Sequence, residues 1–317
     1  MPATAQPRFS GSVRLRDRVV RWFGRPESLP FDASPGSPWI LLPPAARKAF
    51  DQIRAVGTPF ATSAFGRPLL GVKTGCNGAY VVHVDGIEND IALISAGERR
   101  GRIEREMLRP LVRGETLSAW RITGRREYIV WPHGDSLPRR ELPPLARRWL
   151  LPFRDQLCGR SDLHGQLPWW SVFRTESARH ERPRVIWADF GLTPRATVIE
   201  PNDPVVPLNS CYAVSCTALD DAHTLSALLN GPLVSAWLNV LAEPARGGYR
   251  RYLGWTVSLL PLPTEWEYAR QQLAPLGARA MSGDVPGDAE LLAAALEAYR
   301  LTLADVQPLL SWTGDCD

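Results

Sequence analysis

The sequence predicts an α+β fold, in which a mixed, twisted β-sheet is flanked by helices and followed by a helical C-terminal tail. Two patterns predict it: short β-branched or aromatic runs bounded by turn residues, and stretches of helical apolar spacing between them. The chain has 317 residues, of which 44% are hydrophobic and 22% charged. Those proportions are typical of a globular protein with a sizeable core.

Four short runs have the composition of strands. They combine β-branched and aromatic residues and end at Gly, Pro, Asn or Asp, and we predict that all four belong to one mixed sheet. The runs are residues 80–84, 128–131, 184–187 and 211–215.

Helical spacing of apolar residues marks further segments. After the Pro43-Pro44 pair, the apolar residues from Ala46 to Val56 recur at helical intervals and stop before Gly57. Breaks are predicted within two later segments, at Pro152 and at Gly231-Pro232. The remaining segments predicted to be helical are residues 102–108, 144–157, 222–241 and 289–304.

The chain divides by composition into three parts. Residues 1–40 are predicted to be a linker or docking segment, because their prolines are spaced too closely for regular structure. Residues 41–270 form the predicted main domain, and residues 271–317 a helical acidic tail. Between Ser282 and Asp317, seven acidic residues oppose one arginine, a local net charge of 1 − 7 = −6.

Positive charge is concentrated in the middle of the chain. From Arg99 to Arg126, nine arginines oppose three acidic residues, a local net charge of 9 − 3 = +6, although the whole chain carries only +4. Arginine makes planar, bidentate contacts with phosphate and guanine, so this cluster favours a polyanionic partner. Arginine–glutamate pairs on a solvated helix face account equally well for some of these residues.

The sequence shows no targeting or metal-binding signal. No stretch approaches the roughly 20 consecutive apolar residues of a membrane span, and the first ten residues lack an apolar signal segment. We therefore expect a cytoplasmic protein with no membrane partner. The five cysteines form no Cys-x-x-Cys pair and the five histidines are scattered, so neither a disulfide framework nor a metal site is predicted.

Catalytic motifs do not indicate an active site. The sequence has no Gly-x-Ser-x-Gly elbow, Walker loop, Gly-x-Gly-x-x-Gly turn or His-Glu-x-x-His helix. Asp189, Glu200 and Asp203 follow strand-like residues, as the ligands of a metal-dependent nuclease do, but the Glu/Asp-x-Lys partner of such a site is missing. We predict no catalytic, cofactor-binding or metal-binding residue in this chain.

A series of motifs in a fixed order is more informative. It begins with Gly71 to Val82, a glycine-punctuated polar turn that runs into a β-type segment, and continues with Arg109 to Gly114 and Tyr128 to Pro132. The series resembles the TaqI-like C-terminal specificity domain of adenine-specific DNA methyltransferases, including single-chain restriction-modification enzymes. The later motifs are residues 145–160, 168–172, 184–189, 209–214, 228–230 and 260–263.

The resemblance implies that residues 41–270 are a target-recognition domain that binds duplex DNA. It also implies that the complete system methylates adenine with S-adenosylmethionine after base flipping. The catalytic half of the family has no counterpart here, because residues 42–45 and 142–145 lack the groups that grip a flipped adenine. We therefore expect no cofactor in this chain and a separate or N-terminal adenine methyltransferase domain as its partner.

Nine residues are the candidates for DNA contact. Arg109 and Arg113 lie in a matching motif and suit phosphate contact, whereas Trp170 suits stacking or core packing. The turn at residues 73–77 suits DNA contact or turn formation alone, and residues 246–252 form a basic-aromatic loop. The full set is Lys73, Thr74, Asn77, Arg109, Arg113, Trp170, Arg246, Tyr249 and Arg251.

Three interpretations of the whole chain stay open. The chain is a split-gene specificity subunit that docks a catalytic chain, a truncated remnant of a longer enzyme, or a protein-interaction module without DNA binding. A docking role would use residues 1–40 and the acidic tail. The salt dependence of binding separates the last interpretation from the others, because the affinity for phosphate groups falls steeply as the salt concentration rises.

Overall fold

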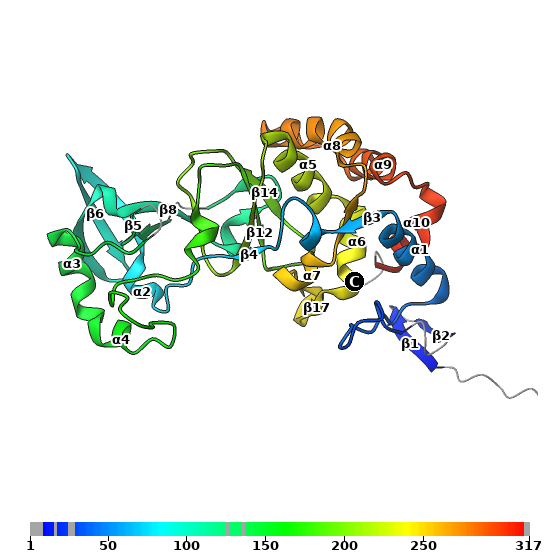
Figure 1. Cartoon of the computed structure of the whole chain (residues 1–317), viewed down its shortest axis with the longest axis horizontal. Helices are drawn as coiled ribbons and strands as arrows, with labels where there is room; N and C mark the ends of the chain where they lie inside the picture. The colour runs from blue at the N-terminus through cyan, green and yellow to red at the C-terminus, as the bar shows by residue number, and fades with distance from the viewer. Residues whose placement is uncertain (1–8, 16–17, 25–28, 125–126, 135–136, 314–317) are drawn as a thin grey trace, which may run out of the picture. The chain divides into compact units, whose positions relative to one another are not determined.

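The computed structural model describes residues 9–15, 18–24, 29–124, 127–134 and 137–313 (Figure 1). It confirms the predicted α+β class, with several mostly antiparallel sheets and a helical C-terminal region.

The chain folds into two compact units. The helical unit comprises Met1–Arg67, Phe190–Arg195 and Asp220–Asp317, and the sheet unit comprises Pro68–Asp189 and Ala196–Leu219. The boundaries of the two units differ from the predicted domain boundaries at residues 40 and 270. The predicted division into docking segment, recognition domain and tail stays a prediction about function.

The sheet unit contains two main sheets. One has six strands in the order β15-β8-β11-β5-β6-β7, all antiparallel except for the parallel pair of β15 and β8. Its strands are β5 (Val81–Glu88), β6 (Ile91–Ala96), β7 (Arg99–Glu104), β8 (Leu108–Val112), β11 (Glu127–Val130) and β15 (Val206–Pro207).

The second sheet has four strands in the order β14-β12-β16-β4, and the short strands β9 and β10 pair separately. The prediction of a single sheet is therefore wrong: two of the four expected runs lie in each sheet. Composition predicts extended backbone but does not encode which strands pair. The strands are β4 (Leu69–Leu70), β9 (Leu117–Ser118), β10 (Arg121–Ile122), β12 (Arg184–Ala188), β14 (Ala196–Ile199) and β16 (Cys211–Ser215).

The helix predicted for residues 102–108 is also wrong. The structure has the end of β7 there, a short 3-10 turn η3 (Arg105–Met107), and the start of β8. All six residues of β7 pair with β6, and Ile103 is fully buried between more exposed neighbours. Cross-strand pairing has overridden the local helical preference of this Arg- and Glu-rich stretch.

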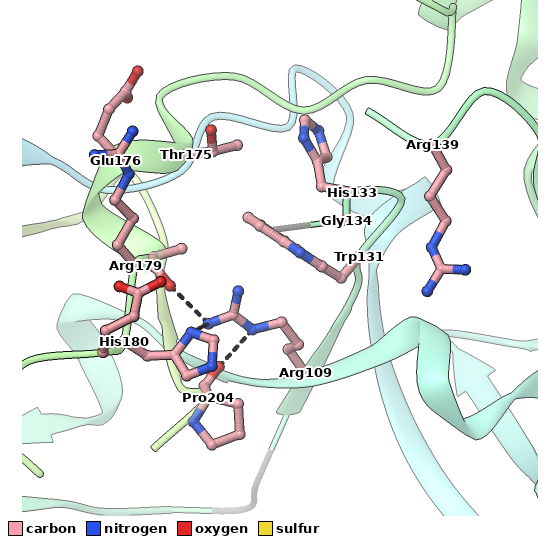
Figure 2. A pocket seen from close by; sticks show the side chains of 12 residues that line it. Arg109, Trp131, His133, Gly134, Arg139, Thr175, Glu176, Arg179, His180 and Pro204 are labelled. Carbon is pink, nitrogen blue, oxygen red and sulfur yellow. Dashed lines mark hydrogen bonds between the residues drawn. The ribbon is translucent and has the colours of Figure 1, made fainter. Parts of the chain in front are cut away.

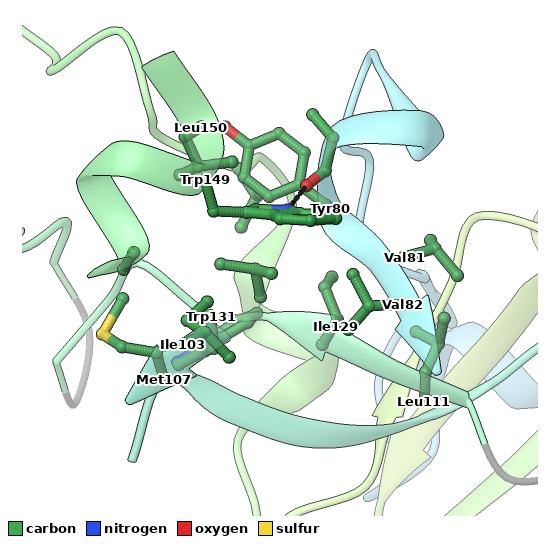
Figure 3. Close-up of a cluster of buried hydrophobic side chains, with 14 of the residues drawn as sticks. Tyr80, Val81, Val82, Ile103, Met107, Leu111, Ile129, Trp131, Trp149 and Leu150 are labelled. Carbon is green, nitrogen blue, oxygen red and sulfur yellow. Dashed lines mark hydrogen bonds between the residues drawn. The ribbon is translucent and has the colours of Figure 1, made fainter. Parts of the chain in front are cut away.

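Helices pack on the six-stranded sheet. The break predicted at Pro152 is confirmed, and Figure 3 shows Trp149 and Leu150 reaching from α3 toward Ile103 and Ile129 of the sheet. The indole nitrogen of Trp149 donates to the Ala79 carbonyl at 2.8 Å. The helical pieces of the sheet unit are α2 (Asn77–Tyr80), η4 (Gly114–Thr116), α3 (Pro144–Leu150), η5 (Leu151–Phe153), α4 (Arg154–Cys158) and η6 (Thr175–Ala178).

The helical unit confirms the helix after Pro43 and the break at Gly231. Its core includes the stacked rings of Phe50 and Trp237, with centres 4.7 Å apart. The residues predicted as a tail belong to this core, because Tyr299 is buried and its hydroxyl donates to the Pro261 carbonyl. The helices are α1 (Pro44–Ala55), α5 (Leu219–Asn230), α6 (Pro232–Leu241), α7 (Gly254–Ser258), α8 (Trp266–Met281), α9 (Asp288–Tyr299) and α10 (Leu303–Thr313).

Several short elements complete the helical unit. The strands β3 and β19 pair with each other, and β18 pairs with both β13 and β17. The elements are β3 (Gly57–Pro59), η2 (Phe60–Thr62), β13 (Phe190–Gly191), β17 (Glu243–Pro244), η7 (Arg246–Gly248), β18 (Arg250–Arg251) and β19 (Pro261–Pro263).

The first 40 residues contain regular structure, contrary to prediction. Strands β1 (Phe9–Leu15) and β2 (Arg18–Gly24) pair antiparallel. Strand β2 is rich in strand-forming residues, and the closely spaced prolines that prompted the prediction come after both strands.

No single helix in the described part of the chain has the length and apolar character of a membrane span. Helices α5 and α6 satisfy those criteria only when taken together, and they are bent by 65° at the break between them.

Candidate nucleic-acid interface

The glycine-punctuated turn at residues 71–77 is held by its own contacts. A Cβ on Gly71 would lie 2.0 Å from the Leu208 carbonyl oxygen, so only glycine permits this close approach of backbones. Thr74 is 2% exposed and donates to Asn77 Oδ1 at 2.6 Å. Lys73 Nζ lies 2.5 Å from Asp162 Oδ2, and the hydrogen bond from Lys73, together with its charge, holds the pKa of that carboxyl below the usual range.

Arg160 is the residue that fixes this turn, and sequence reasoning did not give it a role. Its three guanidinium nitrogens donate to the carbonyls of Leu157, Thr74 and Trp169, at 2.9, 2.5 and 2.6 Å. Gly75 has a φ of +67° and faces the Arg160 side chain. The structure therefore places Lys73, Thr74 and Asn77 together in a turn whose polar groups largely satisfy one another.

Arg113 and Trp170 are also engaged within the protein. Arg113 Nε lies 3.2 Å from Glu127 Oε2 on the neighbouring strand β11. The indole of Trp170 donates to the Arg139 carbonyl at 3.0 Å and meets Trp169 edge to face. Both side chains thus have a structural role, and a DNA contact by either stays a prediction.

Arg109 of β8 lines a cavity of about 320 Å³, the Arg109 cavity (Figure 2). Its Nε donates to the Pro204 carbonyl and its Nη2 to the Ala178 carbonyl, each at 2.8 Å. The guanidinium lies 4.7 Å from the centre of the Trp131 ring. Burial lowers the pKa of Arg109 to about 10. The best phosphate candidate from sequence is therefore also a clamp, because its Nε and Nη2 bind two backbone carbonyls of the protein.

Arg184 of β12 completes this clamp, and the sequence did not single it out. It is 1% exposed and donates to the carbonyls of Ser177, Asp203 and Val205. Burial lowers its pKa to about 10. All of its hydrogen-bond acceptors are backbone oxygens, a relationship that residue composition cannot reveal.

A second cationic site lies where α3 packs on β7. Arg99, Arg100 and Arg102 from the strand line a groove of about 560 Å³ together with Arg148 from the helix. Among the described residues no carboxylate lines this arginine groove. The sequence identified the cluster that begins at Arg99, but it missed Arg148, because only helix packing brings that residue alongside β7.

Two details fix the shape of the arginine groove. A Cβ on Gly101 would lie 2.7 Å from the Trp149 ring, so glycine allows the strand to approach the helix. The guanidinium of Arg99 lies 3.8 Å from the centre of the same ring. Burial lowers the pKa of Arg99. Arg102 is more loosely held, in an exposed pair with Glu88 at 3.3 Å.

The basic-aromatic loop of the helical unit forms a hairpin from β17 through η7 to β18. Arg246 and Arg251 are exposed there, and neither has an ion pair within the described residues. Tyr249 stacks on Phe190, with ring centres 4.8 Å apart, and both rings are more than a third exposed. The three predicted contact residues of this loop are thus all exposed.

No family model and no curated protein matches the chain. Among solved structures, the chain is similar to the Type IIL restriction-modification enzyme MmeI in complex with DNA, with a TM-score of 0.43 and 12% sequence identity. The similarity covers 75% of this chain and 32% of that protein. A TM-score of this size does not establish a common fold.

Proposed function

We propose that this chain is the DNA sequence-recognition module of an adenine-specific methyltransferase of the restriction-modification type. In this proposal it binds duplex DNA and positions it for methylation by a catalytic domain outside the chain. The observation that carries the proposal is the arginine groove, where four guanidiniums gather without a lining carboxylate. The ordered motifs from Gly71 to Pro263 give the family context in which such a surface binds DNA.

The arginine groove suits contact with the DNA backbone. Its side chains are planar, permanently charged donors, the type that binds phosphate oxygens most effectively. Phosphate contacts set affinity and register, whereas base-edge contacts set sequence. The groove is therefore the source of affinity in this proposal, and sequence readout falls to loops near it.

The exposed hairpin with Arg246, Tyr249 and Arg251 is a second proposed contact surface. It combines cations with the exposed aromatic pair of Tyr249 and Phe190, the mixture that binds backbone and bases together. Lys73 and Asn77 stay proposed contacts from the turn. S-adenosylmethionine, in this proposal, belongs to the catalytic partner, and this chain supplies DNA binding alone.

The experiment that tests the proposal is a salt titration of duplex binding. A labelled duplex of mixed sequence is titrated with the purified chain, and anisotropy gives the affinity at increasing KCl. We expect log affinity to fall linearly with log salt, by about 0.9 for each phosphate contact. A chain that does not bind duplex at low salt is instead the protein-interaction module of the third interpretation.

A further inference from the structure

Phe190 and Tyr249 form an exposed pair of stacked aromatic rings, the ring stack, in the helical unit. Their ring centres lie 4.8 Å apart and their planes differ by only 9°. The two residues are 38% and 39% exposed, although each ring covers part of one face of the other. Neither residue is buried in the core, so the ring stack presents aromatic surface to a partner.

Strand register places the ring stack and an arginine on one face of the three-stranded sheet β13-β18-β17. Phe190 of β13 lies directly opposite Arg251 of β18, and Tyr249 precedes Arg251 by two residues in extended backbone. Side chains that are directly opposite, or two residues apart on one strand, share a face. Glu243 of β17 also lies opposite Arg251, so this face carries one carboxylate.

The charge of the hairpin that carries Tyr249 is mainly positive. Between Glu243 and Tyr252, three arginines oppose one acidic residue, a local net charge of 3 − 1 = +2. Arg246 and Arg251 are the exposed cations among them. Cations beside aromatic rings are complementary to a phosphate backbone that carries planar bases, so charge favours a nucleic acid over a protein as the partner.

The hairpin holds Tyr249 in place before a ligand binds. The Ala245 N–H donates to the Tyr249 carbonyl at 2.7 Å, and Gly247 and Gly248 have φ values of +77° and +76°, which favour glycine. A Cβ on Gly247 would lie 3.7 Å from Tyr249 Cδ2, so glycine also keeps a side chain away from that edge of the ring. A ring that is already positioned loses little conformational entropy when a planar ligand stacks on it.

An intact duplex offers no partner to the flat face of an aromatic ring along its length. Its bases stack on one another and show only their edges in the grooves. An unpaired base, in contrast, exposes a π-face, and such a base stacks on an aromatic side chain whatever its identity. The ring stack therefore fits a base outside the helical stack better than it fits a groove of intact duplex.

We propose that the ring stack binds an unpaired base, and that Arg246 and Arg251 contact the phosphates beside that base. The inference rests on the proposed function and deepens it, because it names the feature of DNA that this hairpin takes. In this arrangement the arginine groove binds the backbone of paired DNA, and the hairpin binds where a base has left the stack.

The experiment compares two labelled duplexes of the same sequence, of which one carries a single unpaired adenine as a bulge. Anisotropy gives the affinity of the full chain for each. We expect the bulged duplex to bind about fivefold or more tightly than the intact one, the effect of one stacked base. Equal affinities would overturn the inference, leave duplex binding intact and assign the ring stack to a protein partner. A chain that binds neither duplex contradicts both proposals.

A variant of the ring stack separates stacking from the flexibility of bulged DNA. Phe190→Leu with Tyr249→Leu keeps apolar side chains but removes the aromatic faces, so the preference for the bulged duplex should fall below about twofold. Both residues are more than a third exposed, so the variant should fold. Trp255→Leu removes an exposed ring of α7 outside the ring stack and is the control, which should keep the preference. A preference that survives in the double variant contradicts the site.

A charge variant on the same face should have a different effect. Glu243→Gln removes the carboxylate opposite Arg251, so it should strengthen binding of both duplexes several-fold. The ratio of the two affinities should stay unchanged, because both duplexes present phosphates and only one presents an unpaired base. If Glu243→Gln changes this ratio as much as the double variant does, charge determines the preference and the stacking proposal is wrong.

Discussion

Arg109 and Arg184 bind alternate carbonyls along the same two segments. In the first, Arg184 binds the Ser177 oxygen and Arg109 binds that of Ala178; in the second, Arg184 binds Asp203 and Val205 on either side of Arg109's partner Pro204. The arginines come from strands β8 and β12 of the two main sheets. Their paired clamp therefore ties η6 and the segment before β15 to both sheets of the sheet unit.

Replacing Arg184 should destabilise the sheet unit strongly. Arg184→Met leaves three backbone carbonyls without their donor, and we expect a loss of about 3 kcal/mol or more, measured by urea unfolding. Arg182→Gln, an exposed arginine two residues away, is the control and should change stability by less than about 0.5 kcal/mol. Similar stabilities for the two variants would show that the clamp is dispensable.

His133 should make stability depend on pH. Its folded pKa of about 4 is below the ordinary value of 6.5, so the unfolded chain binds more protons between those values. The stability from neutral His133 is present above pH 6.5 and is lost as the pH falls toward 4. It amounts to about 3 kcal/mol. His133→Gln, which keeps an acceptor for the Val172 N–H, should flatten this part of the stability curve. A stability curve that His133→Gln leaves unchanged contradicts the assignment of this pH dependence to His133.

Gly101→Ala should disrupt the contact between β7 and α3. The added methyl would lie 2.7 Å from the Trp149 ring, and we expect a loss of about 1 to 3 kcal/mol on thermal unfolding. Gly78→Ala is the matched control, since its added methyl meets nothing within 4 Å and it lies in helix α2. That variant should be neutral or gain up to about 1 kcal/mol. Equal losses would mean that the approach of β7 to Trp149 is not tight.

The exposed hairpin should contribute to duplex binding without contributing to stability. Arg246→Gln with Arg251→Gln should reduce the salt slope of binding by roughly 1 to 2 and leave unfolding unchanged. Lys48→Gln, an exposed cation on α1 in the same unit, controls for the general loss of charge. If the control lowers the slope as much as the hairpin variant does, the hairpin has no special role.

The sequence predicted those features that depend on neighbouring residues. The structure confirms the predictions that rest on local effects. These are the helix that starts at Pro44, the helix breaks at Pro152 and Gly231, and the extended backbone of the β-rich runs. The prediction from sequence failed at residues 102–108, where the pairing of β7 with β6 decides the conformation.

The roles of single side chains depended on distant partners. Arg109 is fixed by carbonyls near residues 178 and 204, and Arg113 by Glu127 on another strand. Arg148 joins the arginine groove only because α3 packs on β7. A cluster of arginines in sequence therefore indicated the sign of the partner's charge, but could not indicate which guanidiniums are available to it.

The most direct test of the account is duplex affinity against salt for a variant that removes three exposed cations of the arginine groove. Arg100→Gln, Arg102→Gln and Arg148→Gln together should lower affinity at low salt by at least about tenfold and reduce the salt slope by roughly 2 to 3. Arg147→Gln, the neighbouring exposed arginine on α3 that does not line the groove, should change the slope by less than about 1. Binding by the triple variant that matches the unmodified chain in both affinity and slope would contradict the account.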